Sequence, residues 1–210
     1  GLTAPPRPTL RIIVNLLTKP RWCLGIAGTK RRSFGNLVGH VKGVSDMSSL
    51  AAWTNEQFDP RLSWPDVEWV KRQWGGKLIL KGIMDVEDAK LAVASGADAI
   101  IVSNHGGRQL DGADSSIHAL PAIVEAVGQA IEVHLDGGIR SGQDVLKAWA
   151  LGARGTYIGR AMVYGLGAMG EAGVTKALEI IHKELDVTMA FCGHTQLTNV
   201  DRSILLPGSY

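Results

Sequence analysis

The sequence predicts an α/β fold, the second half of a (β/α)8 TIM barrel with strands 5 to 8, preceded by a long basic loop region. First, short apolar segments of strand type alternate with helical patterns, an order typical of parallel strands joined by right-handed crossovers. Second, a helix, a Gly-Ala pair and a strand recur, because residues 87–104 align without gaps on residues 143–160. Third, a closed barrel takes eight strands and typically about 250 residues, whereas this chain of 210 residues offers four strands. The Gly-x-Gly-x-x-Gly turn of a Rossmann sheet is absent, which favours the barrel.

Each element follows from a local pattern. Ser63 and Asp66 have the spacing of a capping box, and an apolar stripe at helical spacing then runs to Trp74, where two glycines end the helix. Apolar runs predict strands at residues 78–82, 99–103, 132–136 and 155–159, with helices at 85–95, 117–127 and 143–151. A last long helix, broken at its glycines, is predicted over residues 162–185.

The first 45 residues differ in composition from the rest. They carry eight Lys and Arg and no Asp or Glu, and four of the eight prolines lie before residue 21. Between Pro8 and Pro20 one helical face is apolar, which predicts a short basic amphipathic helix, and residues 30–43 are expected to be a surface excursion. We therefore predict a basic loop and amphipathic segment after barrel strand 4 (1–62), the barrel half (63–190) and a C-terminal tail (191–210). The N-terminal barrel half is expected to be absent from this chain.

Composition excludes several classes of protein. With 45% hydrophobic and 20% charged residues, the chain is expected to be a soluble globular domain or a large part of one. No apolar run reaches the roughly 18 residues that span a bilayer, and residues 1–9 lack the order of a signal peptide. Cys23 and Cys192 have no metal-binding spacing, so we expect no metal site, no disulfide framework and a reducing, cytoplasmic location. We also expect no nucleic acid partner.

Side chains with catalytic potential follow the predicted strands, where a barrel carries its active site. Lys81 lies inside an apolar strand, where its charge is costly unless an anion meets it; the alternative is a lysine that reaches solvent past the strand tip. After the next strand His105 offers a base, two glycines allow a ligand to approach, and Arg108 offers a bidentate clamp for a carboxylate or phosphate. The alternative for His105 is a structural role. His134 is interpreted as a packing residue.

The third and fourth strands end in glycine and arginine segments. These segments contain Asp136, Gly137, Gly138 and Arg140, and then Gly159 and Arg160. In a barrel they follow strands 7 and 8, whose loops commonly bind phosphate through backbone N–H groups and a helix N-terminus. The alternative is that Ser141 is only an N-cap and that the arginines are solvated. The pattern favours phosphate, so a phosphorylated cofactor is the simplest ligand.

Together these motifs resemble the C-terminal half of the FMN-dependent L-2-hydroxy acid dehydrogenase and oxidase family. The resemblance runs from Gly1 to about Ile204 and rests on residues 80–82, 103–111, 136–140 and 159–160. The string Ser-Asn-His-Gly-Gly-Arg-Gln-Leu-Asp at residues 103–111 is the most specific of these. Residues 58–64 and 119–123 are most similar to the bacterial, membrane-associated L-lactate dehydrogenase branch, with mandelate dehydrogenases second.

The resemblance implies a role for each motif. Lys81 would lie at the N1/O2 edge of the flavin and stabilise its reduced, anionic form. His105 would take a proton from the substrate, and Arg108, beside it, would bind the substrate carboxylate. Whether His105 takes the carbon or the hydroxyl proton stays open. The FMN would be held by Lys81, Ser103, Asp136, Gly137, Gly138, Arg140, Gly159 and Arg160.

The resemblance also implies a substrate and partners. The substrate would be a small L-2-hydroxy acid, with L-lactate first, and electrons would pass through FMN to a quinone or similar acceptor. A mandelate- or glycolate-type oxidase that uses O2 is the alternative. The absent N-terminal half of the barrel would supply substrate-binding tyrosines, a second arginine and the aspartate that orients the histidine, so we expect this chain alone to be inactive. The family also implies a homo-oligomer, a tetramer.

The basic opening suggests where the protein acts. An apolar helical face beside many cations suits a peripheral position on the anionic inner face of the cell membrane, near a quinone. Packing of this segment on a neighbouring subunit is the alternative. A non-enzymatic module that binds phosphate or an anionic surface is a further alternative, but it leaves Lys81 and His105 unexplained. The apolar face consists of Leu10, Ile13, Val14 and Leu17, with Trp22 nearby.

Overall fold

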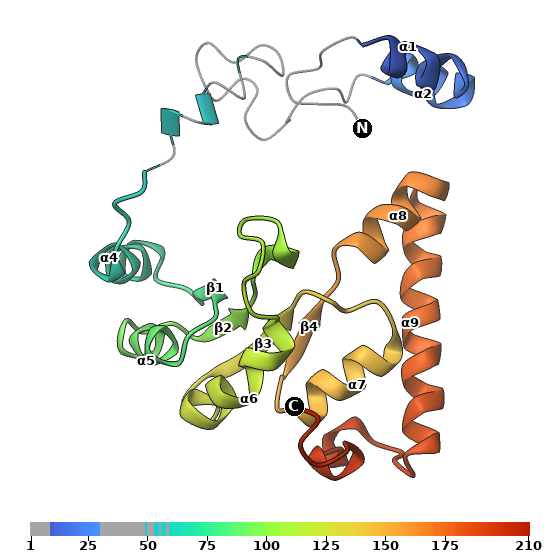
Figure 1. Cartoon of the computed structure of the whole chain (residues 1–210). Coiled ribbons are helices and arrows are strands. Elements are labelled where there is room, and N and C mark those ends of the chain that lie inside the picture. Colours follow the sequence, from blue (N-terminus) through green and yellow to red (C-terminus); the bar gives the residue numbers. More distant parts are fainter. Residues whose placement is uncertain (1–8, 30–48, 50–52, 55, 58) are drawn as a thin grey trace. The chain divides into compact units, whose positions relative to one another are not determined.

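The chain folds as two compact units, Gly1–Leu62 and Ser63–Tyr210. The computed structural model describes residues 9–29, 49, 53–54, 56–57 and 59–210 (Figure 1). The surface excursion expected at residues 30–43 lies outside these residues.

Two short helices make up most of the described part of the first unit. α1 (Leu10–Leu17) is the predicted amphipathic helix, and its N-cap Thr9 accepts a hydrogen bond from the backbone N–H of Ile12 at 3.3 Å. α2 (Pro20–Gly28) is a helix that the sequence pattern did not predict; its first residue is a proline, whose fixed φ suits a first helical turn. The thiol of Cys23 donates to the carbonyl oxygen of Leu16 at 3.3 Å and links the two helices. None of the residues in these two described helices is buried.

The second unit alternates helices and strands in the predicted order (Figure 1). Each strand differs from its predicted ends by at most two residues. The predicted capping box is present before the first helix, where the Asp66 carboxylate accepts hydrogen bonds from the backbone N–H and the hydroxyl of Ser63 at 2.8 and 2.7 Å. The strands are β1 (Ile79–Ile83), β2 (Ala99–Val102), β3 (Glu132–Asp136) and β4 (Gly155–Tyr157). The helices are α4 (Trp64–Trp74), α5 (Val86–Ala94), α6 (Ser116–Val127), α7 (Gly142–Ala150), α8 (Arg160–Met169) and α9 (Glu171–Phe191).

The four strands form one parallel sheet in the order β1-β2-β3-β4. Their register places Lys81, Ile101, His134 and Gly155 side by side on one face. Side chains alternate along a strand, so the residues between them point to the other face. A bulge between Lys81 and Ile83 shifts the register at the end of β1. The predicted α/β class with four parallel strands is confirmed.

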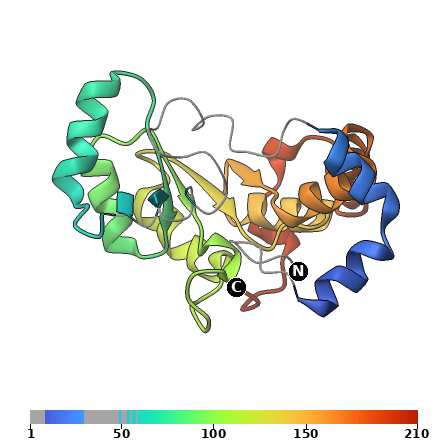
Figure 2. The ribbon, with the colours of Figure 1, turned by 90° about the horizontal axis from the view of Figure 1, so that it is seen from above.

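Of the helices described in the second unit, those that pack on the sheet cover one of these two faces. The ribbon of α6 lies beside β2 and β3 (Figures 1 and 2). The side chains of β2 and β3 on that face pack with Leu120 and Ile123 of α6 in one core. Burial of this apolar area, at about 25 cal/mol per Å², is the main force that holds the helices to the sheet. On the other face Ile79 and Tyr157 remain 46% and 39% exposed. The covered strand residues are Ile100, Val102, Val133 and Leu135.

The C-terminal residues pack on the second unit. The long helix predicted over residues 162–185 is divided at Gly170 into α8 and α9, as its glycines suggested. After α9, Val200 is buried against Leu146 and Ala150 of α7. Residues 191–210, predicted as a tail, therefore contribute to the packing of this unit.

Candidate functional site

The predicted site residues gather at the carboxyl ends of the strands. The loops there surround two adjoining cavities of about 490 and 540 Å³, and Lys81 and His105 line both. Ser103 lines the smaller cavity, together with Gln109 and Leu110. Every residue that the sequence singled out as catalytic or binding lines one of the two. The larger cavity is lined among others by Arg108, Asp136, Gly137, Gly138, Arg140, Gly159 and Arg160.

Lys81, Ser103 and Asp136 form one hydrogen-bonded group between three strands. The Lys81 ammonium lies 2.7 Å from the Asp136 carboxylate and donates to the Ser103 hydroxyl oxygen at 3.0 Å, and that hydroxyl donates to Asp136 at 2.8 Å. Burial raises the pKa of Asp136, but the hydrogen bonds from Lys81 and Ser103 outweigh it, so its pKa lies below the usual value. The anion that a strand lysine requires is therefore Asp136, a pairing that the sequence did not predict.

The loop after β2 holds His105 in a rare backbone conformation. Its φ is 56°, in the left-handed region that non-glycine residues seldom adopt, and Gly106 and Gly107 follow with φ of 69° each. The Ser103 hydroxyl oxygen accepts a hydrogen bond from the backbone N–H of His105 at 3.1 Å. Such strain persists only where surrounding contacts enforce it, and it is typical of functional sites.

Asn104 enforces this loop conformation. Its side-chain amide donates to the carbonyl oxygen of Asp114 at 3.0 Å, and its side-chain oxygen accepts from the backbone N–H of Gly107 at 3.1 Å. The side chains of His105 and Arg108 are left exposed at the cavity. Within the described part of the chain the His105 imidazole forms no hydrogen bond, so these residues do not fix the orientation that a general base needs.

The N-terminus of α8 is suited to a phosphate group. No described side chain caps it, so its first backbone N–H groups are available to an anion. A Cβ atom at Gly138 or Gly159 would meet nothing within 4 Å, so the cavity is open along both glycines. Arg160 starts the helix, and its guanidinium donates to the carbonyl oxygen of Gly106 at 3.0 Å.

The N-terminus of α7, in contrast, is occupied by carboxylates. Ser141 is its N-cap in a capping box with Asp144, and the same carboxylate accepts from the backbone N–H of Arg140 at 2.9 Å. Glu184 of α9 accepts from the backbone N–H of Gly142 at 3.0 Å. The alternative interpretation of Ser141 as an N-cap is thus correct. Of these two helix N-termini, that of α8 is therefore the one whose backbone N–H groups can bind an anion in the larger cavity.

Sequence reasoning missed two tyrosines of the site. Tyr157 and Tyr164 line the larger cavity. The period-two alternation of a strand places Tyr157 on the same face as Gly159. This alternation was the signal from which Tyr157 could have been predicted to lie at the site. His134, interpreted as a packing residue, does pack against Tyr157, with ring centroids 5.8 Å apart.

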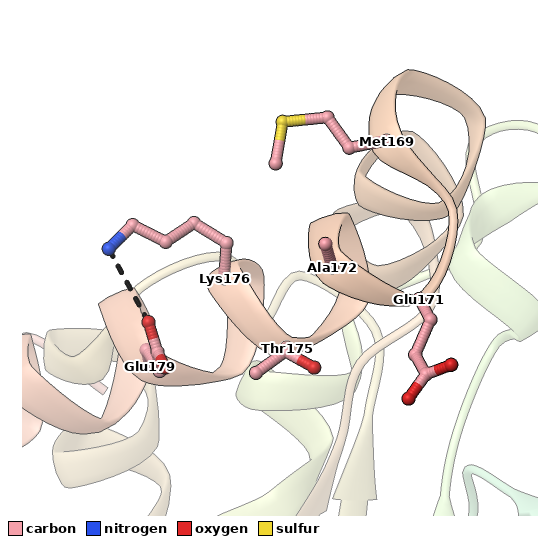
Figure 3. Close-up of a pocket in the computed structure, with 6 residues that line it drawn as sticks. All are labelled: Met169, Glu171, Ala172, Thr175, Lys176 and Glu179. Atoms are coloured by element: carbon pink, nitrogen blue, oxygen red, sulfur yellow. Dashed lines mark hydrogen bonds and ion pairs between the residues drawn. The ribbon is translucent and has the colours of Figure 1, made fainter.

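A third hollow, of about 520 Å³, lies on α8 and α9 (Figure 3). Two of its lining residues, Lys176 and Glu179, form an ion pair along α9, with Nζ and Oε2 3.4 Å apart. None of the residues that the sequence singled out lines it, and we assign it no role. Across the described residues, no group of three His, Cys, Asp or Glu side chains is placed to hold a metal ion. The lining residues of the hollow are Met169, Glu171, Ala172, Thr175, Lys176 and Glu179.

Known sequences resemble this chain along almost all of its length. The profile of the family described as FMN-dependent dehydrogenase matches residues 1–207. An L-lactate dehydrogenase of Caulobacter sp. (strain K31) is 46% identical over 207 residues, which cover 98% of this chain and 54% of the relative. An L-lactate dehydrogenase of Pseudomonas syringae pv. syringae (strain B728a) is 44% identical over 202 residues, 96% of this chain and 53% of the relative.

Solved structures give the same result. The monotopic membrane protein (S)-mandelate dehydrogenase matches with a TM-score of 0.91 and 35% identity, over 97% of this chain and 54% of that chain. A mandelate oxidase matches with a TM-score of 0.69 and 45% identity, over 75% and 46% of the two chains. The chain thus spans about half the length of the relatives that it matches. From its motifs, its fold and these matches, the chain belongs to the FMN-dependent dehydrogenase family.

Proposed function

We propose that this chain is the C-terminal part of an FMN-dependent oxidoreductase that oxidises an L-2-hydroxy acid, L-lactate, to the 2-keto acid. The observation that carries the proposal is the Lys81, Ser103 and Asp136 group at the centre of the strand ends. A base and a carboxylate clamp, His105 and Arg108, line the same cavity. A strained histidine, a lysine paired with a carboxylate, and arginines that line one cavity are typical of an active site.

We propose further that the chain supplies strands 5 to 8 of a TIM barrel and that an N-terminal half supplies strands 1 to 4. The support is the sheet face with its half-exposed Ile79 and Tyr157, because side chains from all eight strands fill the interior of a closed barrel. The relatives, about twice as long as this chain, have room for the other half. This half is the first partner of the chain, and a homo-tetramer of complete barrels is the assembly that we propose.

The residues of the larger cavity fit FMN. A phosphate would bind the N-terminus of α8 beside Arg160 and Arg140, along the open glycines. Asp136 and Ser103 offer oxygen atoms for hydroxyl groups of the ribityl chain, and Lys81 offers a cation for the flavin ring. FMN, when bound, supplies the acceptor for the two electrons that leave the substrate.

The protein residues perform the remaining chemistry. Oxidation of a hydroxy acid to a keto acid removes two electrons and two protons. His105 takes one of the protons, and bound FMN would supply the acceptor for the other together with the two electrons. Arg108 binds the carboxylate through a two-pronged contact, which orients the substrate. The imidazole of His105 would be oriented by the N-terminal half, so the chain alone would be inactive.

L-lactate is proposed as the substrate because relatives that match nearly the whole chain are named L-lactate dehydrogenases. A quinone is proposed as the acceptor because a position on the membrane would bring the reduced flavin near a membrane quinone. The likeness to (S)-mandelate dehydrogenase favours mandelate as the second candidate. An enzyme that passes electrons to O2 is the alternative for the acceptor, in line with the likeness to mandelate oxidase.

We also propose that α1 and α2 hold the protein on the anionic inner face of the cell membrane. Leu10, Leu17 and Leu24 are 80%, 76% and 73% exposed, and cations flank them on the same two helices. None of the helices in the described ranges has the length and apolar character to span a bilayer. An apolar surface with basic flanks suits a helix pair that lies in the lipid interface. The similar (S)-mandelate dehydrogenase is described as a monotopic membrane protein.

A completed barrel tests the proposal. It joins this chain to the part of the Caulobacter L-lactate dehydrogenase that the chain does not match, which by this proposal is the N-terminal half. We expect the completed barrel to be yellow with bound FMN and to oxidise L-lactate, and the chain alone to be inactive. A folded but colourless barrel would contradict the proposal. Turnover of mandelate but not of lactate would favour the second substrate.

A further inference from the structure

Glu132, His134 and Tyr157 are linked by hydrogen bonds on the face of the sheet opposite α6, and the proposed reaction does not use them. His134 Nε2 lies 3.0 Å from the Glu132 carboxylate, and His134 Nδ1 lies 3.1 Å from the Tyr157 hydroxyl oxygen. The His134 side chain is only 14% exposed. Both nitrogen atoms of this imidazole therefore have a polar partner.

The sheet register allows these hydrogen bonds. His134 pairs with Gly155, and Asp136 pairs with Tyr157, on the neighbouring strands β3 and β4. A Cβ atom at Gly155 would lie 3.1 Å from His134 Nδ1, closer than most such contacts, so the glycine leaves the space that the imidazole fills. From this space the ring reaches diagonally to Tyr157, two residues further along β4.

The chemistry of the three groups sets the direction of both hydrogen bonds. A carboxylate only accepts, so Nε2 of His134 carries the proton that it shares with Glu132. In a neutral imidazole the other nitrogen then has a lone pair, so the Tyr157 hydroxyl donates to Nδ1. The phenol oxygen keeps its own lone pairs, and it is the better acceptor because hydrogen bonds in a chain polarise one another.

Tyr157 presents this acceptor at the larger cavity. It is 39% exposed and lines the cavity beside Lys81, Asp136 and Gly159. Tyr164 lines the same cavity but is 71% exposed, and its hydroxyl has no hydrogen-bond partner among the described residues. The two tyrosines thus differ in exposure and in whether a hydrogen bond fixes the hydroxyl.

We propose that Tyr157 is a further binding residue of the cavity, whose hydroxyl oxygen accepts a hydrogen bond from the ligand held between Lys81 and Arg160. Glu132 and His134 are positioning residues, which fix the direction in which the hydroxyl donates. The identity of the ligand rests on the proposed function: it is FMN, whose ribityl hydroxyl groups are donors. Tyr157 thereby selects a ligand that offers a donor at this point of the cavity over one that offers only acceptors.

The first arm of the test reads the His134 tautomer by nitrogen NMR on the full chain. We expect a protonated Nε2 and a bare Nδ1, with Tyr157→Phe changing the Nδ1 signal and Tyr164→Phe leaving both signals in place. A protonated Nδ1 in the neutral ring would overturn the inference. Tyr157→Phe removes only the hydroxyl, so the packing of the sheet is preserved.

The second arm measures FMN affinity in the completed barrel. We expect Tyr157→Phe and His134→Gln each to weaken FMN binding about 3- to 10-fold, the range of one lost hydrogen bond. Tyr210→Phe is the neutral control, because Tyr210 lines neither cavity. Because His134 acts through Tyr157, the double variant should bind no more weakly than Tyr157→Phe alone. Unchanged affinity in Tyr157→Phe would overturn this inference while the proposed function stands. No FMN binding by the unsubstituted barrel would overturn both.

Discussion

The guanidinium of Arg160 donates a hydrogen bond from Nη2 to the carbonyl oxygen of Gly106, across 3.0 Å. This contact joins the first residue of α8 to the loop that carries His105, two segments far apart in the sequence. Among the described residues this is the hydrogen bond that the guanidinium forms, so Nη1 and Nε can donate to an anion at the uncapped N-terminus of α8. One side chain thus connects the candidate phosphate site with the candidate base.

Replacing Arg140 and Arg160 together by Ala should release the flavin from the completed barrel. Each charge-assisted contact with a phosphate contributes about 1.5 kcal/mol or more, so affinity should fall at least about 100-fold. Flavin absorption after dialysis is the measurement. Arg154→Ala is the matched control, because Arg154 lies over the ring of Trp149, 5.4 Å from its centre. A double variant that stays yellow would show that the phosphate site is placed wrongly.

Replacing His105 by Gln should leave FMN bound and reduce turnover about 10² to 10⁴-fold, the usual contribution of general-base catalysis. The left-handed backbone at this position adds strain for most side chains, and Asn adopts this conformation more readily. His105→Asn therefore separates lost chemistry from backbone strain, and it should be as slow as His105→Gln. Near-normal turnover in either variant would remove His105 from the mechanism.

Replacing Asp98 by Asn should make the thermal stability of the chain less dependent on pH in the acid range. The Asp98 carboxylate accepts hydrogen bonds from Lys71, from Lys77 at 2.8 Å and from the backbone N–H of Leu78 at 2.8 Å, and these hold its pKa well below the usual value. A depressed pKa in the folded state gives stability that is present above the unfolded value of about 3.9 and is lost as pH falls toward the folded value.

The thermal midpoint of Asp98→Asn should therefore lie below that of the natural chain at pH 7, and the difference should shrink as pH falls below about 4. Thermal unfolding followed by circular dichroism at several pH values measures this. Asp186→Asn, at an exposed position of α9, is the control and should have little effect at any pH. A difference that stays constant from pH 7 to acid would refute the assignment.

The completed barrel should sediment with anionic phospholipid vesicles at low salt and be partly released at high salt, because salt screens the electrostatic share of binding. Two sets of variants separate the apolar from the electrostatic contribution to vesicle binding. Changing Leu10 and Leu17 to Ser should remove the salt-resistant part, and changing Arg11, Lys19 and Arg21 to Gln should remove the salt-sensitive part. Equal sedimentation after deletion of residues 7–32 would exclude the segment as the membrane contact.

The sequence was sufficient to predict the elements of the second unit because each has a local signal. The capping box at Ser63 and Asp66, the apolar strands and the glycines that end helices all act within a few residues. The strand ends, and with them the cavity residues, follow from this alternation and from parallel pairing. α2 escaped prediction because its large apolar residues Trp22, Leu24 and Ile26 are spaced two residues apart and gather on no single helical face.

What the sequence could not predict are pairings between distant segments. Nothing local links Lys81 with Asp136, or Gly142 with Glu184, because each pair meets only when strands or helices pack together. The second pairing fills the N-terminus of α7 and so decides which helix end remains for phosphate. The hydrogen bonds that link Glu132, His134 and Tyr157 depend on the register of β3 and β4 and on the absence of a side chain at Gly155. The alternation of side chains along one strand does not reveal the register between two strands.

The most direct test of the proposed function is anaerobic addition of L-lactate to the completed barrel while the flavin absorption is followed. We expect the yellow absorption to disappear as the flavin is reduced, and we expect His105→Gln, with FMN still bound, to bleach about 10² to 10⁴-fold more slowly. A flavin that stays oxidised in the presence of L-lactate would contradict the proposed function. Reduction of the flavin at the same rate in His105→Gln as in the unsubstituted barrel would contradict the role of His105.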